Sequence, residues 1–152
     1  MSDATTVGSI MTRHVTTVTM DTSLRQVREI FESVRFHHLV VVENDRVVGV
    51  ISDRDLLKHL SPFVGKLTER AQDANTLNRR VHQVMSRRLV SCAPTTSLRE
   101  AGEVMLDQRV DCLPVLDAAG SCVGVITLRD MLSWSLVECA GEVDTCPVRK
   151  AG

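Results

Sequence analysis

This sequence of 152 residues has few aromatic residues, no long hydrophobic run and almost no excess of charge of either sign. Only 3% of the residues are aromatic, so base stacking on an aromatic platform is not expected. The formal net charge is −1, and no block of like charges indicates an affinity for nucleic acid or an anionic membrane. The apolar runs have the length of a strand, and residues 1–6 show no signal-peptide pattern. We therefore expect a cytoplasmic globular protein without a membrane segment.

The five cysteines lack the pattern of a zinc site or a disulfide framework, because their number is odd and no CxxC spacing occurs. Cys92, Cys112 and Cys122 lie in apolar, strand-like runs, and we interpret them as small core residues. Cys139 and Cys146 lie near the C-terminus. We interpret them as free thiols, with a disulfide or a redox contact as the alternative.

Sequence motifs of enzymes are also missing. The chain has no G-x-S-x-G nucleophile elbow, no Walker motif and no G-x-G-x-x-G loop. His37 and His38 are adjacent, but no third metal ligand stands at helical or hairpin spacing from them. We therefore predict a protein that acts by binding, with no catalytic residue, metal or cofactor. A metal or redox sensor built on these histidines and the C-terminal cysteines is a weaker alternative.

The sequence repeats itself after 74 residues, and after 75 residues beyond Gly120. The tetrapeptide T-S-L-R occurs at residues 22–25 and again at 96–99, and V-G-V-I occurs at 48–51 and again at 123–126. Such matches in one order indicate two copies of one unit. We place the first copy at residues 7–60, a connector at 61–79, the second copy at 80–134 and a C-terminal tail at 135–152.

Each copy is predicted to fold as β-α-β-β-α. The S-x-x-[QE] patterns that begin at Ser23 and Ser97 are capping boxes, which start a helix. Two apolar runs separated by turn residues then indicate a hairpin. One copy is too small to bury its apolar faces, so we expect an α/β (α+β) fold in which the two copies pack sheet against sheet with pseudo-two-fold symmetry. The other elements expected are first strands at 15–19 and 89–93 and last helices that begin at Arg54 and Arg129.

The junction between the hairpin and the last helix is the most informative part of each copy. Residues 49–55 and 124–130 both read G-φ-φ-[ST]-x-R-D, where φ is apolar. A hydroxyl and a carboxylate at the end of a strand can bond ribose hydroxyls, and a helix start with an adjacent arginine suits a phosphate. The same spacing also describes a capping box with Asp at its third helical position. Spacing alone leaves both interpretations open, with capping the simpler one.

The repeat and its G-φ-φ-[ST]-x-R-D junction resemble the CBS domain family, and the two copies together resemble a Bateman module. The resemblance implies a regulatory pair that binds AMP, ADP, ATP or S-adenosylmethionine between the copies and acts on a linked enzyme or channel. One departure is Val40, which stands where the family commonly has a proline and where the second copy has Pro114. By resemblance, Ser52, Asp55, Thr127 and Asp130 would bind ribose, and Arg54, Arg129 and His37 would bind phosphate.

The resemblance also implies that each adenine is held by the copy opposite its ribose. One cleft would combine Thr16, Phe36, His37 and Leu39 with Thr127 and Asp130, and the other would combine Ser91, Val110, Asp111 and Leu113 with Ser52 and Asp55. His37 can support a phosphate, whereas Asp111 at the matching position repels one, so we expect the cleft with His37 to bind better. Phe36 also offers a base more surface than Val110.

Two partners follow from the same resemblance. One is a second copy of the chain in a disc-shaped homodimer, for which the apolar faces of the last helices are candidates. The other is a regulated protein that the sequence does not identify. The main alternative to nucleotide sensing is a structural or protein-interaction pair whose two junctions only cap helices and bind no nucleotide.

Overall fold

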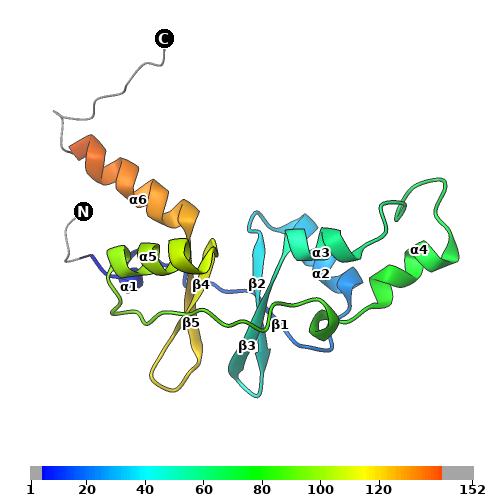
Figure 1. The fold of residues 1–152 in the computed structure, drawn as a ribbon, viewed down its shortest axis with the longest axis horizontal. Helices are drawn as coiled ribbons and strands as arrows, with labels where there is room; N and C mark the ends of the chain where they lie inside the picture. Colours follow the sequence, from blue (N-terminus) through cyan, green and yellow to red (C-terminus); the bar gives the residue numbers. More distant parts are fainter. Residues whose placement is uncertain (1–4, 142–152) are drawn as a thin grey trace, which may run out of the picture.

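The structure, a computed structural model, describes residues 5–141, with side chains up to Glu138. It confirms the predicted α/β (α+β) fold, in which two hairpins stand side by side at the centre and helices lie on the outer sides (Figure 1). The first half contains α1 (Val7–Ile10), β1 (Thr17–Val18), α2 (Leu24–Ser33), β2 (His38–Glu43), β3 (Arg46–Ser52) and α3 (Asp53–His59). After α4 (Ala71–Asn75) and two 3-10 turns at Thr76–Asn78 and Val81–Gln83 come α5 (Leu98–Gln108), β4 (Cys112–Leu116), β5 (Cys122–Thr127) and α6 (Leu128–Gly141).

Capping boxes start α2 and α5, as the sequence predicts. The Ser23 hydroxyl accepts a hydrogen bond from the Gln26 N–H at 3.3 Å, and Gln26 Oε1 accepts one from the Ser23 N–H at 3.1 Å. Ser97 and Glu100 repeat the arrangement at 3.2 and 3.1 Å. The backbone N–H and hydroxyl of Ser97 hold the pKa of the Glu100 carboxyl below its usual range. Each helix therefore begins where the repeat places a serine.

The first copy has a three-stranded sheet in the order β1-β2-β3, and the second has only the hairpin β4-β5. The prediction of a strand at residues 89–93 is wrong, because this segment pairs with β4 at Cys92 alone. The Cys92 N–H donates to the Pro114 carbonyl at 3.1 Å, and the Cys92 carbonyl accepts from Leu116 N–H at 2.9 Å. The next bond in this register would need an N–H on residue 114, which proline lacks. Val40 at the matching place supplies that N–H, so β1 pairs over two residues.

The two copies exchange their first segments. Val7 and Met11 pack in the core of the second copy, whereas Val81 and Met85 pack in the core of the first. Figure 1 shows α1 beside the helices of the second copy. Backbone hydrogen bonds hold each exchanged segment where it crosses a strand of the other copy. Thr12 exchanges two hydrogen bonds of 2.9 Å with Val125, and Ser86 exchanges hydrogen bonds of 2.9 and 3.1 Å with Val50. Neither core is complete without a segment from the other repeat.

The crossings need a glycine at the strand over which each segment passes. A Cβ on Gly49 would overlap the carbonyl oxygen of Ser86. A Cβ on Gly124 would lie 2.5 Å from the sulfur of Met11 and 3.0 Å from the carbonyl oxygen of Thr12. The glycine that opens each G-φ-φ-[ST]-x-R-D junction thus serves the exchange of segments.

Helix α6 is longer than the sequence suggests. It continues to Gly141, beyond the predicted start of the tail at residue 135, because residues 135–140 contain neither proline nor glycine. Trp134 packs against the second core. Cys146 and the side chain of Cys139 lie outside the described residues. None of the helices between residues 5 and 141 is both long and apolar enough to cross a membrane.

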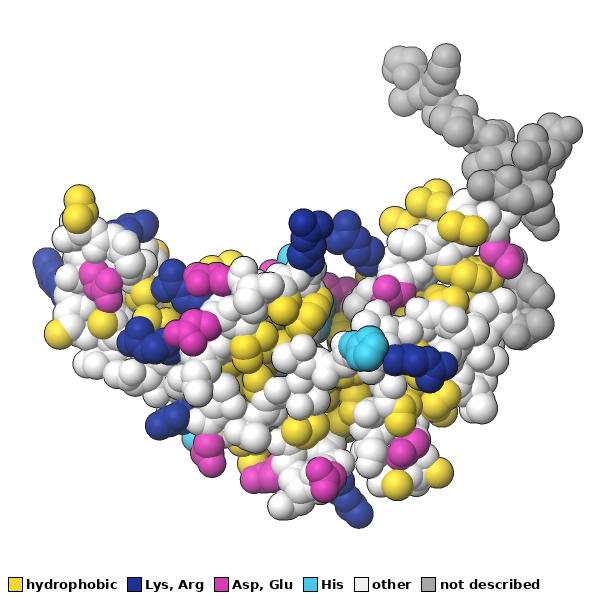
Figure 2. All heavy atoms as spheres, turned by 180° about the vertical axis from the view of Figure 1, so that it is seen from behind, with side chains coloured by type: hydrophobic (Ala, Val, Ile, Leu, Met, Phe, Trp, Pro, Cys, Tyr) yellow, Lys and Arg dark blue, Asp and Glu magenta, His cyan; other side chains and the backbone are white. Residues whose placement is uncertain are grey.

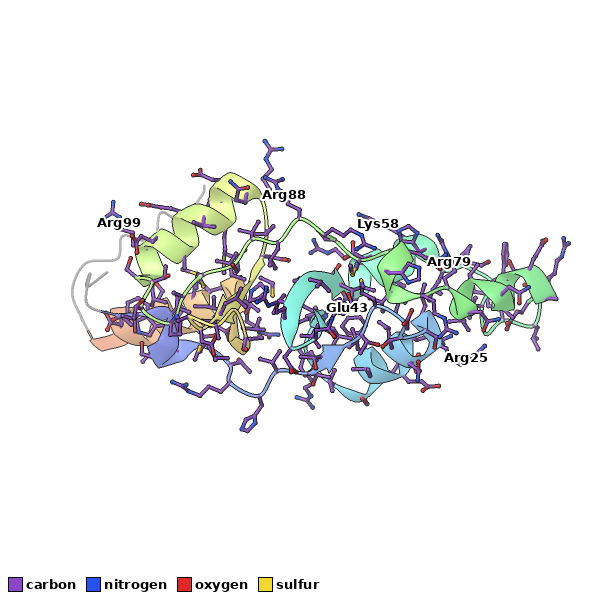
Figure 3. The ribbon with its side chains drawn as sticks, turned by 90° about the horizontal axis from the view of Figure 1, so that it is seen from below. Arg25, Glu43, Lys58, Arg79, Arg88 and Arg99 are labelled. Carbon is purple, nitrogen blue, oxygen red and sulfur yellow. The ribbon has the colours of Figure 1, made fainter. Side chains whose placement is uncertain are left out.

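Basic side chains are distributed over both copies. Figure 3 shows Arg99 and Arg88 around the second copy and Lys58 around the first, at separate places on the surface. This distribution agrees with the balanced composition of the sequence.

Candidate functional site: a cavity between the two copies

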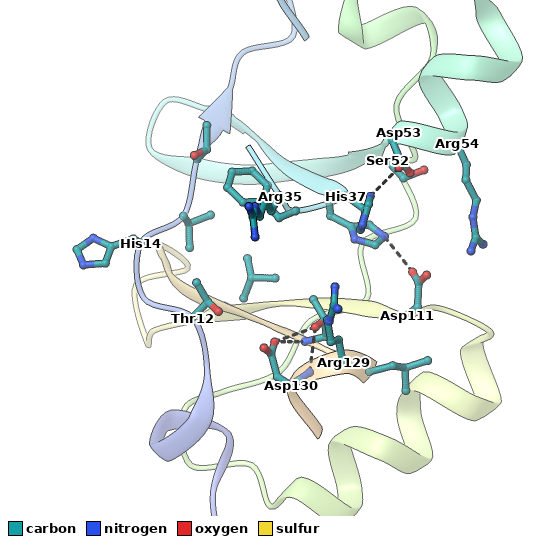
Figure 4. A pocket seen from close by; sticks show the side chains of 17 residues that line it. Thr12, His14, Arg35, His37, Ser52, Asp53, Arg54, Asp111, Arg129 and Asp130 are labelled. Atoms are coloured by element: carbon teal, nitrogen blue, oxygen red, sulfur yellow. Dashed lines mark hydrogen bonds and ion pairs between the residues drawn. The ribbon is translucent and has the colours of Figure 1, made fainter. Parts of the chain in front are cut away.

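A cavity of about 520 Å³ lies between the two copies (Figure 4). Its volume is in the range of small-molecule sites. One wall comes from the first copy, with the segment around Thr16, the residues before β2 and the start of α3. The other wall comes from the end of β5 and the start of α6. The cavity therefore lies where the junction motif of the second copy faces the β1 and β2 entries of the first.

The Thr127–Asp130 junction opens onto this cavity and also caps α6. The Thr127 hydroxyl accepts from the Asp130 N–H at 3.3 Å and donates to Asp130 Oδ2 at 2.8 Å. The Thr127 N–H donates to the same oxygen at 2.9 Å. Asp130 Oδ1 has no hydrogen-bond partner among the described residues. Capping thus engages only one of the two carboxylate oxygens, so the two interpretations of the motif do not exclude each other.

The Ser52–Asp55 junction has the same local geometry. The Ser52 hydroxyl accepts from the Asp55 N–H at 3.1 Å, and Asp55 Oδ2 accepts from the N–H and the hydroxyl of Ser52 at 2.9 Å each. Ser52 and Arg54 line the cavity, but Asp55 does not. The two junctions therefore share a cap but differ in the exposure of their aspartates to the cavity.

Several predicted binding residues meet in the cavity. Those that line it are Thr16, Phe36, His37, Ser52, Arg54, Asp111, Thr127, Arg129 and Asp130. Leu39 and Leu113 are fully buried in the two cores, so their side chains do not reach it. Ser91 and Val110 are not on its wall, and Asp111, expected in the cleft opposite His37, lies in the same cavity as His37. The structure thus gathers most of the first predicted cleft and only part of the second.

Two histidine–carboxylate contacts are also present at the cavity. His37 Nδ1 lies 2.7 Å from Asp53 Oδ2 within the first copy. His38 Nε2 lies 2.9 Å from Asp111 Oδ1 and so joins the first copy to the second. The histidines thus contact different carboxylates, and no group of three or more potential metal ligands occurs among the described residues.

Arg35, Asp53 and His38 are among the cavity residues that the sequence analysis missed. The match of Arg35 with Arg109 in the repeat is a signal that could identify it. No signal points to Asp53, because it occupies the variable position of the junction motif, where the second copy has Leu128.

The described cysteines are poorly suited to thiol chemistry. Cys112 is buried, and Cys92 and Cys122 are half-buried. Burial raises the pKa of the Cys112 thiol to about 12 and that of the Cys92 thiol to about 11. Both thiols are therefore protonated at neutral pH, and the thiolate is the reactive form. This agrees with their interpretation as core residues.

Comparison with known proteins places the chain in a family. The CBS domain family model matches residues 7–62 and 81–137. The chain therefore belongs to the CBS domain family and carries a pair of these domains. It is 32% identical over 128 residues to a CBS domain-containing protein of Dictyostelium discoideum, covering 83% of this chain and 88% of that protein.

Two further relatives bear on function. The structure of CBSX2 in complex with AMP superposes with a TM-score of 0.72 at 26% identity, covering 88% of this chain and 98% of that one. Inosine-5′-monophosphate dehydrogenase of Nitrosopumilus maritimus is 29% identical over 125 residues, or 82% of this chain. Those residues span only 23% of that enzyme, so the likeness does not extend to the rest of it.

Proposed function

We propose that this chain is a cytoplasmic regulatory module, and not an enzyme, that binds AMP, ADP or ATP between its two CBS domains and signals to a partner protein. The observation that carries the proposal is the Thr127–Asp130 junction, which lines a cavity walled by both copies and whose capping bonds use only one carboxylate oxygen of Asp130. The AMP complex of CBSX2 supports an adenosine ligand.

In this proposal, Asp130 Oδ1 and the Thr127 hydroxyl bind the ribose. The adenine lies against Phe36, a residue that is 37% exposed, and the 5′-phosphate meets Arg129 and His37. Because these residues come from different copies, a bound ligand bridges them and favours one relative placement over others. A partner protein would respond to that placement.

A thermal-shift screen tests the proposal. A ligand that binds only the folded state at a hundred times its Kd stabilises it by about 2.7 kcal/mol, which raises the Tm of a chain of this size by several degrees. We expect this rise with AMP, ADP or ATP, and none with guanosine nucleotides at the same concentration. S-adenosylmethionine belongs in the same screen. An unchanged Tm at millimolar concentration of every adenosine ligand would contradict the proposal.

The alternative function is a structural or protein-interaction pair without a nucleotide. The complete capping boxes at both junctions favour it, because they show that the motif stabilises helices without any ligand. The same screen separates the two functions, since only the sensor gains stability from an adenosine ligand.

We also propose that the chain forms a homodimer through α6. Hydrophobic side chains gather over the end of the molecule that carries this helix (Figure 2). Leu128, Leu132 and Leu136 recur every four residues along it, and the last two are 61% and 63% exposed. Water contact with such a stripe is unfavourable, and a second copy of the same stripe would cover it.

The double substitution Leu132→Glu and Leu136→Glu is therefore expected to convert the dimer to a monomer, as measured by size-exclusion chromatography with light scattering. Leu67→Glu is the matched control, because Leu67 is fully exposed in the connector and distant in sequence from α6. It should remain a dimer. A monomeric unmodified chain at micromolar concentration would rule out this interface.

A further inference from the structure

Asp111 places a carboxylate on the cavity wall where the first copy has His37 at the matching position of the repeat. Its side chain is 45% exposed and lies 2.9 Å from His38 Nε2. Its carbonyl accepts a hydrogen bond of 3.0 Å from the N–H of Leu128, at the start of α6. The backbone of Asp111 is therefore bonded within the second copy, while its carboxylate contacts a histidine of the first.

The arginines and aspartates of the cavity balance each other. A site built for a highly charged anion has an excess of positive charge, as phosphate-binding sites do. This cavity has three arginines and three aspartates, and the histidines are its other titratable groups. The charged side chains are Arg35, Arg54, Arg129, Asp53, Asp111 and Asp130.

The position of Asp111 decides which part of a ligand meets it. In Figure 4, Asp111 lies at the end of the cavity away from His14, beyond His37. In the proposed arrangement the ribose is at Asp130, and if the adenine lies on the His14 side of the ribose, the 5′ group points toward that end. One phosphate meets Arg129 and His37, and each additional phosphate approaches the carboxylate of Asp111. Like charges at short range in a partly enclosed site repel each other.

We infer that Asp111 makes the cavity select adenosine ligands by charge, favouring a single phosphate or an uncharged 5′ group over a triphosphate. The inference rests on the proposed nucleotide-binding function and adds the class of adenosine ligand that the site takes. Asp111 is then a specificity-determining residue that limits the number of phosphates.

Isothermal titration of the full chain with AMP, adenosine and ATP, in buffer with EDTA so that no divalent cation shields the phosphates, tests this selection. We expect AMP to bind at least about tenfold more tightly than ATP. Asp111→Asn keeps a side-chain oxygen for His38 but removes the charge. It is expected to tighten ATP binding about tenfold and to change AMP binding less than about threefold.

Asp107→Asn is the matched control, because Asp107 is exposed on α5, does not line the cavity and carries the same charge. It should leave the ratio of AMP to ATP affinity unchanged. ATP binding as tightly as AMP to the unmodified chain overturns the inference without any variant, and so does an unchanged ratio in Asp111→Asn. Binding of AMP or adenosine in those experiments leaves the proposed function standing, whereas no binding of any of the three ligands overturns both.

Discussion

Replacing Asp130 by alanine is expected to weaken the binding of an adenosine nucleotide about tenfold to a hundredfold. A hydrogen bond to a charged group contributes about 1.5–3 kcal/mol, and each 1.4 kcal/mol is about tenfold in Kd. Asp130 lines the cavity, and its Oδ2 also accepts the bond that orients the Thr127 hydroxyl. Alanine would therefore remove one ribose ligand and misorient another. Isothermal titration with AMP measures the loss.

Asp55→Ala separates this effect from the loss of a helix cap. Asp55 closes the same capping box at α3 but does not line the cavity. Each variant should lose about 1 kcal/mol of folding stability through its cap, so their Tm values should fall by similar amounts. Only Asp130→Ala should then bind AMP more weakly. Equal losses of affinity in both variants would show that the junctions act only as caps or that the two sites are equivalent.

The features that the sequence predicted correctly are local ones. A capping box at Ser23 or Ser97 involves residues within one helical turn, and a hairpin involves two runs separated by a short turn. The repeat adds independent support, because each local pattern occurs twice. Two copies, two hairpins and the starts of α2 and α5 are therefore predictable from the residues alone. The last helices begin at Asp53 and Leu128, one residue before the predicted starts at Arg54 and Arg129.

The features that the sequence missed depend on contacts between copies. Hydrophobic periodicity shows that Val7 and Val81 are buried, but it does not show that each is buried in the other copy's core. In the same way, the contact between His38 and Asp111 joins residues far apart in the chain. Sequence matching assigned Asp111 to the cleft opposite His37, whereas both side chains face one cavity. The sequence therefore did not indicate that His37 and Asp111 line the same cavity.

The hydrophobic residues that the resemblance assigns to adenine binding show a related limit. Leu39 and Leu113 follow the polar entry to their strands, but alternation along a strand turns both into the cores. Position in a motif gives the place of a residue along the backbone, while the direction of its side chain depends on the sheet. Phe36, which precedes β2, does face the cavity.

Gly49→Ala is expected to destabilise the folded chain by about 2–3 kcal/mol, the upper part of the range of about 1–3 kcal/mol for overpacking, because here backbone has to move. The added Cβ overlaps the carbonyl oxygen of Ser86, which is backbone and accepts a bond of 3.1 Å from the Val50 N–H. Relief of the overlap must shift the crossing segment, and with it Met85, away from the first core. Urea unfolding followed by circular dichroism measures the loss.

Gly124→Ala is the matched control in the other repeat. There the nearest atom is the sulfur of Met11, at the flexible part of a side chain, and the backbone oxygen of Thr12 is 3.0 Å away. A methionine can change rotamer, so we expect a smaller loss of about 1 kcal/mol. Because each core contains a segment of the other repeat, both variants should unfold in one transition rather than two. A Gly49→Ala variant as stable as Gly124→Ala would contradict the backbone overlap at Ser86, and a separate early transition of one copy would show that the exchanged segments do not couple the two domains.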